Sequence, residues 1–162
     1  MRKPRSWLIL LILALGAVTA SAADSASDRI VFLHVEITDT RAELVDVAIV
    51  DGSLKRPRQV HAYPGKIRFE VLDADANRLF EGVVEDPTRV VYEYADESGR
   101  LQSKVVERDR GIAVIRIPYD EAAVAVSVSR VTDLIKQGTA TRAAVRHLGT
   151  IAADWAEVVD DE

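Results

Sequence analysis

The feature that most constrains the fold of this chain is a series of short segments in which apolar and polar residues alternate. In residues 29–37 the apolar residues Val31, Leu33, Val35 and Ile37 are spaced two apart, which is the spacing that buries one face of a β-strand. Similar segments follow at 44–50, 67–71, 79–84, 89–94, 101–106, 112–117 and 124–128. Turn-forming residues separate them roughly every eight to twelve residues, with no helical pattern between them, so the chain is predicted to be all-β.

Consecutive segments are predicted to form hairpins: 29–37 with 44–50, 67–71 with 79–84, and 89–94 with 101–106. The polar stretch 53–65 is too long for a tight turn and is expected to cross between sheets. We therefore predict an immunoglobulin-like antiparallel β-sandwich of about 7–8 strands, with a closed barrel as the alternative. The chain has no cysteine, which excludes the disulfide of antibody-type domains and every thiolate metal site.

The C-terminal stretch has a different periodicity. Val145, Leu148, Ile151 and Trp155 are spaced by three and four residues, as on one face of an amphipathic helix. We expect a β-sandwich domain over 29–131, followed by a C-terminal amphipathic helix or tail over 132–162.

The N-terminal stretch has the organisation of a secretion signal. Three cations in residues 1–5 precede an apolar run over residues 7–18, which is shorter than the roughly twenty residues of a spanning helix. The small residues Ala20 and Ala22 then form an A-x-A cleavage pattern. We predict a signal peptide over 1–22, a short linker over 23–28, and a mature protein in the periplasm or outside the cell. The richness in alanine, valine, arginine and aspartate suits a bacterial protein.

The charge of the chain limits its partners. The formal net charge is −5, with 21 Lys and Arg against 26 Asp and Glu, and loss of the three signal cations makes it −8. Nucleic acid and anionic membrane surfaces would repel such a protein. No second apolar run is long enough to span a membrane, so no span is predicted in the mature chain.

One segment resembles the start of a calcium-binding loop. Asp73, Asp75 and Asn77 alternate as the first oxygen ligands of such a loop do. However, Arg78 stands where glycine is required and Val84 where a bidentate glutamate is required. A polar hairpin turn is therefore the favoured interpretation, the three residues remain a weak metal candidate, and no cofactor is predicted.

Two features are candidates for contact with a partner. The first is the basic cluster Lys55, Arg56 and Arg58 in the polar connection, which could bind an acidic group through charge-assisted hydrogen bonds. The second is Trp155 in the expected C-terminal helix, although an apolar helix face more often covers its own domain.

Several strand motifs resemble a known family. They are the runs over 65–73, 77–80, 115–118 and 123–128. Together they look like the non-catalytic N-terminal β-sandwich of secreted immunoglobulin-A-type zinc metallopeptidases, over roughly residues 29–131. The resemblance implies an accessory module with an immunoglobulin-like fold. The peptidase domain and its zinc-binding helix are absent from this chain, so neither the activity nor any functional residue is implied.

The sequence contains no G-x-S-x-G elbow, H-E-x-x-H pair or glycine-rich phosphate loop. We therefore predict a non-enzymatic exported module that binds a protein or envelope component. The alternative is a small hydrolase or metal-dependent enzyme in which Asp73, Asp75, Asp96 and His61 converge from separate loops. A carrier of a small ligand inside a barrel is a third hypothesis.

Overall fold

A computed structural model describes residues 28–55, 62–137 and 140–155 of the chain. Its nine strands are β1 (Arg29–Thr38), β2 (Ala42–Asp51), β3 (Lys66–Leu72), β4 (Arg78–Glu85), β5 (Arg89–Ala95), β6 (Leu101–Glu107), β7 (Arg110–Pro118), β8 (Ala125–Gln137) and β9 (Ala140–Ala152). All strand pairs are antiparallel. The all-β prediction is confirmed, with one strand more than expected. The predicted signal peptide over 1–22 and most of the linker lie outside the described residues.

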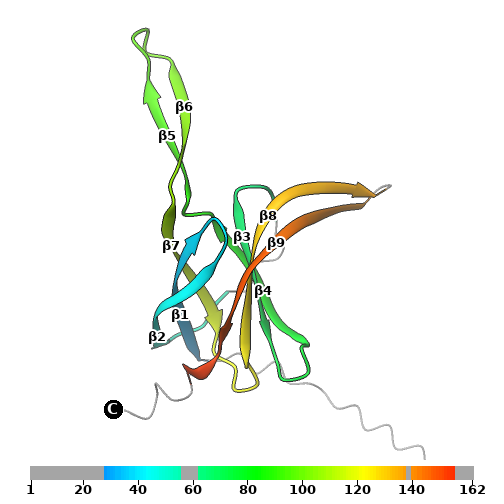
Figure 1. Cartoon of the computed structure of the whole chain (residues 1–162). Coiled ribbons are helices and arrows are strands. Elements are labelled where there is room, and N and C mark those ends of the chain that lie inside the picture. Colours follow the sequence, from blue (N-terminus) through cyan, green and yellow to red (C-terminus); the bar gives the residue numbers. More distant parts are fainter. Residues whose placement is uncertain (1–27, 56–61, 138–139, 156–162) are drawn as a thin grey trace, which may run out of the picture.

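The strands form three sheets (Figure 1). One has the order β2-β1-β7, a second has the order β4-β3-β8-β9, and the third contains only β5 and β6. The first two sheets pack face to face as a sandwich, because their inward side chains share one hydrophobic core. The three predicted hairpins are confirmed, and the connection after β2 leads from one sheet of the sandwich to the other, as expected.

The core follows the alternation in the sequence. In β1, the side chains of Val31, Leu33, Val35 and Ile37 are fully buried, and those between them are only half-buried. Alternate residues of β3, β7 and β8 meet them from the other strands. At the pair Phe69 and Gly82, the aromatic ring lies where a side chain on the glycine would be, since a Cβ there would come within 2.4 Å of the ring.

A β-bulge changes the predicted face of β2. The alternation over residues 44–50 predicts that Val45, Val47 and Ile49 share one apolar face, and Val47 and Ile49 do pack against the core. Val45 is 61% exposed, so its predicted burial is wrong. The register shifts opposite His34 and Val35, leaving Val45 as the unpaired extra residue. An extra residue in one strand reverses which of the following side chains point inward, so Val45 does not share the face of Val47 and Ile49.

The prediction of a C-terminal helix is also wrong, because residues 140–152 form strand β9 beside β8. Here too a bulge explains the error. Ser129 pairs with His147 and Val128 with Gly149, so Leu148 is the extra residue. Its side chain therefore turns inward and is buried like that of Ile151, three residues later. In this strand the bulge produces the spacing that is typical of a helix face.

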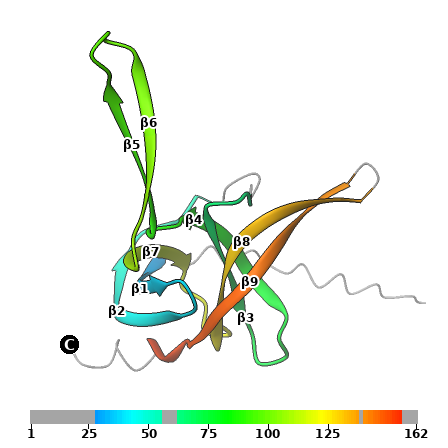
Figure 2. The same ribbon diagram turned by 45° about the horizontal axis from the view of Figure 1, so that its top comes forward.

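The expected boundary at residue 131 lies inside β8, so β8 and β9 belong to the sandwich. Two hairpins extend beyond the body: the β5–β6 pair, and the far ends of β8 and β9 (Figures 1 and 2). None of the described residues forms a helix long and apolar enough to cross a membrane.

Candidate functional site

The most distinctive surface feature is the β5–β6 hairpin, which we call the arm (residues 89–107). It stands out from the sandwich as a separate two-stranded sheet (Figure 2). Its strands pair in continuous register from Arg89 with Glu107 to Ala95 with Leu101. Because no other described strand packs on either face, most side chains of the arm project into solvent on both sides.

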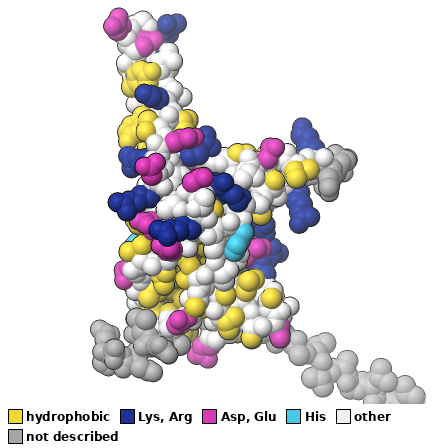
Figure 3. All heavy atoms as spheres, in the orientation of Figure 1, with side chains coloured by type: hydrophobic (Ala, Val, Ile, Leu, Met, Phe, Trp, Pro, Cys, Tyr) yellow, Lys and Arg dark blue, Asp and Glu magenta, His cyan; other side chains and the backbone are white. Residues whose placement is uncertain are grey.

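Apolar side chains are exposed along the arm (Figure 3). On one face Val91 pairs with Val105 and Ala95 with Leu101, and the exposed fractions reach 60% for Val91 and 79% for Leu101. On the other face Tyr92 and Tyr94 lie beyond the pair Val90 and Val106, and Tyr94 is 52% exposed. Contiguous exposed apolar residues on a protein surface are typical of interaction sites.

The tip of the arm is a tight polar turn. The Asp96 carboxylate accepts hydrogen bonds from the Ser98 hydroxyl at 2.6 Å, from the Ser98 and Arg100 backbone N–H groups, and from the Gln102 amide. The Ser98 and Arg100 bonds lower the pKa of Asp96 to about 2. Gly99 adopts a φ of 77°, which favours glycine. Asp96 therefore closes the turn, and its oxygens are occupied by its own loop.

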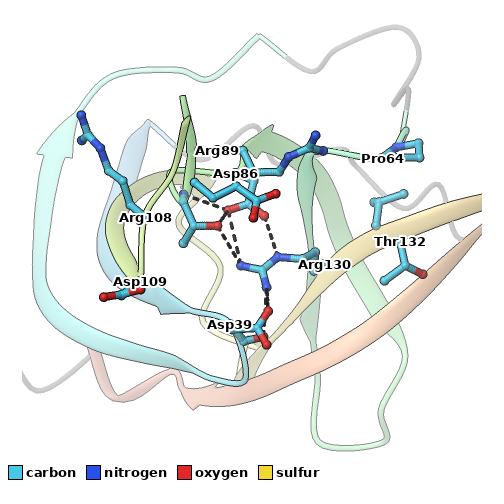
Figure 4. Close-up of a pocket in the computed structure, with 12 residues that line it drawn as sticks. Asp39, Pro64, Asp86, Arg89, Arg108, Asp109, Arg130 and Thr132 are labelled. Atoms are coloured by element: carbon cyan, nitrogen blue, oxygen red, sulfur yellow. Dashed lines mark hydrogen bonds and ion pairs between the residues drawn. The ribbon is translucent and has the colours of Figure 1, made fainter. Parts of the chain in front are cut away.

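A buried ion pair lies where the arm joins the body. The segment between β4 and β5 carries Asp86, whose side chain is fully buried. Nε of Arg130, in β8, donates to the Asp86 carboxylate at 2.6 Å (Figure 4). The Thr88 hydroxyl donates to the same carboxylate, also at 2.6 Å. Burial opposes ionisation of Asp86, but the hydrogen bonds from Thr88 and Arg130 outweigh it and lower its pKa.

The same guanidinium reaches the turn between β1 and β2. Its other nitrogens donate to the backbone oxygens of Thr38 and Asp39, at 3.0 and 2.9 Å, and to the Asp39 carboxylate at 3.0 Å. Arg146, in β9, also donates to Asp39 and is the main reason that the pKa of this carboxyl is lowered. Arg130 thus connects both sheets of the sandwich with the base of the arm, and we call this network the latch (Asp39, Asp86, Thr88, Arg130, Arg146).

A cavity of about 440 Å³ opens beside the latch. Arg89, Glu107, Arg108 and Asp109 also line it, so its lining carries both signs of charge (Figure 4). Arg108 donates to the Tyr92 hydroxyl at 2.8 Å, and the donors of Arg130 point to protein oxygens. The arrangement of these groups is suited to holding the arm in a fixed position.

The outer face of the β4-β3-β8-β9 sheet carries a Ser–His contact that the sequence did not indicate. The Ser127 hydroxyl lies 3.5 Å from Nδ1 of His147, and the Thr150 hydroxyl lies 3.5 Å from Nε2. Nucleophilic catalysis needs a closer contact and a third group that orients the base. Glu70 pairs with Ser127 in the sheet, but its carboxylate binds Arg68 and Arg78. We assign no chemistry to this contact.

Among the described residues of the hydrolase hypothesis, Asp73 and Asp75 share one turn and do not come together with Asp96. Asp73 binds the backbone N–H groups of Asp75 and Asn77 and the Asn77 amide, so the expected polar turn between β3 and β4 is present. The described residues contain no group of three or more His, Cys, Asp or Glu side chains that could hold a metal ion. The turn between β3 and β4, which carries Asp73 and Asp75, lies at the opposite end of the molecule from the tip of the β5–β6 hairpin, which carries Asp96 (Figure 1). The fourth residue of the hydrolase hypothesis, His61, lies outside the described residues.

The two predicted partner contacts have different outcomes. Trp155 is 3% exposed and belongs to the hydrophobic core, so the favoured interpretation, that its apolar face covers its own domain, is confirmed and its side chain is not available as a surface contact. Lys55 is exposed, as expected, while Arg56 and Arg58 lie outside the described residues.

Sequence reasoning identified the segments of the arm but not its exposure. The aromatic and β-branched residues of 89–94 predict an ordinary sandwich strand, and no sequence signal marks Asp86 as the buried partner of Arg130. Comparisons of the chain with protein-family models, with curated proteins and with solved structures found no match.

Proposed function

We propose that this chain is an exported, non-enzymatic binding module whose arm contacts a protein or envelope component. The observation that carries the proposal is the arm itself, a two-stranded ribbon with exposed apolar side chains on both faces. A two-stranded hairpin is at best marginally stable in water without a surface to pack against. Contact with a partner would cover this apolar surface and add the missing layer.

The latch supports the same proposal. A binding element gains affinity when it is held in position before the partner arrives, because less conformational freedom is lost on binding. Arg130 fixes the segment before β5 to both sheets, and Arg108 holds Tyr92 near the start of the arm. The arm thus has a rigid base and an apolar surface.

An immunoglobulin-like character, and a relation to the accessory sandwich of the immunoglobulin-A-type metallopeptidases, are part of this proposal. The order β4-β3-β8-β9 supports them, because the C′, C, F and G strands of variable-type domains are arranged in the same way. The other sheet differs, since β1 rather than β2 pairs with β7. Such a relation would make this chain an accessory module without its own activity.

Site-specific photo-cross-linking in the producing cells tests the proposal. A photoreactive amino acid would replace Leu101 on the arm, and in a control chain it would replace Val45 on β2. Both positions are highly exposed and lie on unrelated surfaces. We expect a discrete adduct from position 101 and none from position 45. Equal labelling from both positions, or no adduct from the arm, would show that the arm is not the contact element.

A further inference from the structure

The outer edge of β5 is a strand edge without the usual protection. Among the described residues β5 pairs only with β6, so its other edge has no strand partner. Edge strands commonly carry lysine, proline or a bulge that prevents pairing with another chain. Residues 89–95 contain neither lysine nor proline, and their two charged residues, Arg89 and Glu93, have opposite signs, so they can pair across such an edge rather than repel. The arm is also the one hairpin of the described part whose register has no shift.

We propose that β5 pairs with β5 of a second copy of this chain, antiparallel and centred on Val91. The inference rests on the proposed function, because it takes the arm as the contact element, and it names the partner. Two arms would then form one four-stranded sheet in the order β6-β5-β5-β6. Three or more strands with an apolar face have the stability that a single hairpin lacks.

The charges of β5 favour Val91 as the residue at the symmetry axis of the paired strands. When two identical strands pair symmetrically and antiparallel, one residue faces its own copy, and residues equally far on either side of it face each other. With Val91 at the centre, Arg89 of each copy faces Glu93 of the other, which gives two pairs of opposite charge. With Glu93 at the centre, two carboxylates face each other, which is unfavourable. With Tyr92 at the centre, Glu93 faces Val91.

The apolar residues fit the same register. Val91, which is 60% exposed in the single chain, contacts its own copy at the symmetry axis. On the opposite face of the sheet Val90 lies across from Tyr92, and aromatic residues opposite β-branched residues stabilise a sheet.

The β6 edge offers no equivalent pairing. Its two charged residues, Lys104 and Glu107, are three positions apart. In a symmetric pairing the residues that face each other differ by an even number of positions, so Lys104 never faces Glu107. A pairing centred on Lys104 would oppose two ammonium groups. Lys104 therefore protects this edge in the way that lysine usually does.

Cysteine cross-linking tests the centre directly, because the chain has no cysteine of its own. In Val91→Cys the paired arms hold two Cα atoms roughly 4.5–5.5 Å apart, within the range of a disulfide. The matched control is Val105→Cys, which pairs with Val91 across the arm and is 47% exposed. In the four-stranded sheet its two copies lie about three strand spacings, or roughly 14 Å, apart.

The experiment uses the full chain, expressed with its own N-terminal segment and purified without denaturation. Under mild oxidation at micromolar concentration, we expect Val91→Cys to form a disulfide-linked dimer at least about tenfold faster than Val105→Cys, because pairing raises the effective thiol concentration. Equal rates, or a faster control, would overturn the proposal.

Charge reversal provides a second test by sedimentation velocity of the cysteine-free chain. Glu93→Arg places guanidinium groups opposite each other and should shift the chain towards the monomer. Addition of Arg89→Glu restores both opposite-charge pairs and should recover the dimer. Since Arg89 also faces Glu107 in its own hairpin, the unfolding temperature of each variant checks that the arm remains folded. A double variant that stays as monomeric as Glu93→Arg, with an unchanged unfolding temperature, would exclude this register.

Failure of this inference is distinguishable from failure of the proposed function. If position 101 forms an adduct with a different protein while the two cysteine variants cross-link equally slowly, the arm is a binding element for another partner. If neither adduct nor disulfide forms, both proposals fail.

Discussion

Replacement of Arg130 by methionine should destabilise the protein strongly, because it removes one member of the buried ion pair. Methionine has a similar length but donates no hydrogen bond. The variant leaves the Asp86 carboxylate buried, with a side-chain exposure of 0%, and with the Thr88 hydroxyl and backbone N–H as its remaining partners. The backbone oxygens of Thr38 and Asp39 also lose the guanidinium donors.

Removing one member of a buried ion pair costs about 3–5 kcal/mol, because the other charge remains buried and unpaired. For a protein of this size the loss corresponds to a fall in the unfolding temperature of about 10–15 °C. Urea denaturation at pH 7 measures the free energy of unfolding, and the fluorescence of the buried Trp155 reports the transition.

The difference between wild type and variant should depend on pH. In the folded wild type the pKa of Asp86 is lowered from 3.8, so its contribution to stability is present above about pH 3.8 and is lost as the pH falls through the lowered pKa. In Arg130→Met the guanidinium no longer offsets the burial of the Asp86 carboxylate, so the pKa of Asp86 in the folded variant rises. Protonation of Asp86 then removes the unpaired buried charge from the variant at a higher pH than in the wild type. The difference in the free energy of unfolding between wild type and variant should therefore narrow as the pH falls from 7 to 4.

The matched control is Arg146→Met, which removes a half-exposed arginine that binds the exposed carboxylate of Asp39. This change should cause only a small fraction of the loss, since exposed ion pairs contribute little. If Arg130→Met costs less than about 1 kcal/mol, or if the gap widens in acid, the latch does not stabilise the fold in the way described.

Three further results are expected. Gly82→Ala should cost about 1–3 kcal/mol, because the new Cβ meets the Phe69 ring, and thermal unfolding measures the loss. Trp155→Ala should cost about 3–5 kcal/mol in urea denaturation, since the side chain fills the core rather than serving a partner. Asp96→Ala should speed amide exchange at the arm tip and leave the exchange of β1 unchanged, because the partners of Asp96 among the described residues lie within residues 98–102. Equal acceleration of both would contradict this local role.

Local patterns were sufficient to predict most strands and three hairpins. Alternation with a period of two and turn-forming residues act over a few positions, so residues 29–37 could be assigned to a half-buried strand without knowing their neighbours. The errors at Val45 and Leu148 have one common cause. Each is the extra residue of a bulge, and a bulge exists only relative to the strand that pairs with it.

The sequence by itself determined that the chain forms β-strands, where most of them begin and end, and that disulfides contribute nothing to it. Only the tertiary structure decided that residues 140–152 form a strand, that the arm stays outside the core, and that Arg130 meets Asp86 and Asp39, which are 44 and 91 positions away in the chain. Strand order and ion pairs of this kind depend on which distant segments share a core. Which segments share a core depends on packing and burial over the whole molecule, so it cannot be predicted from the local spacing of residues.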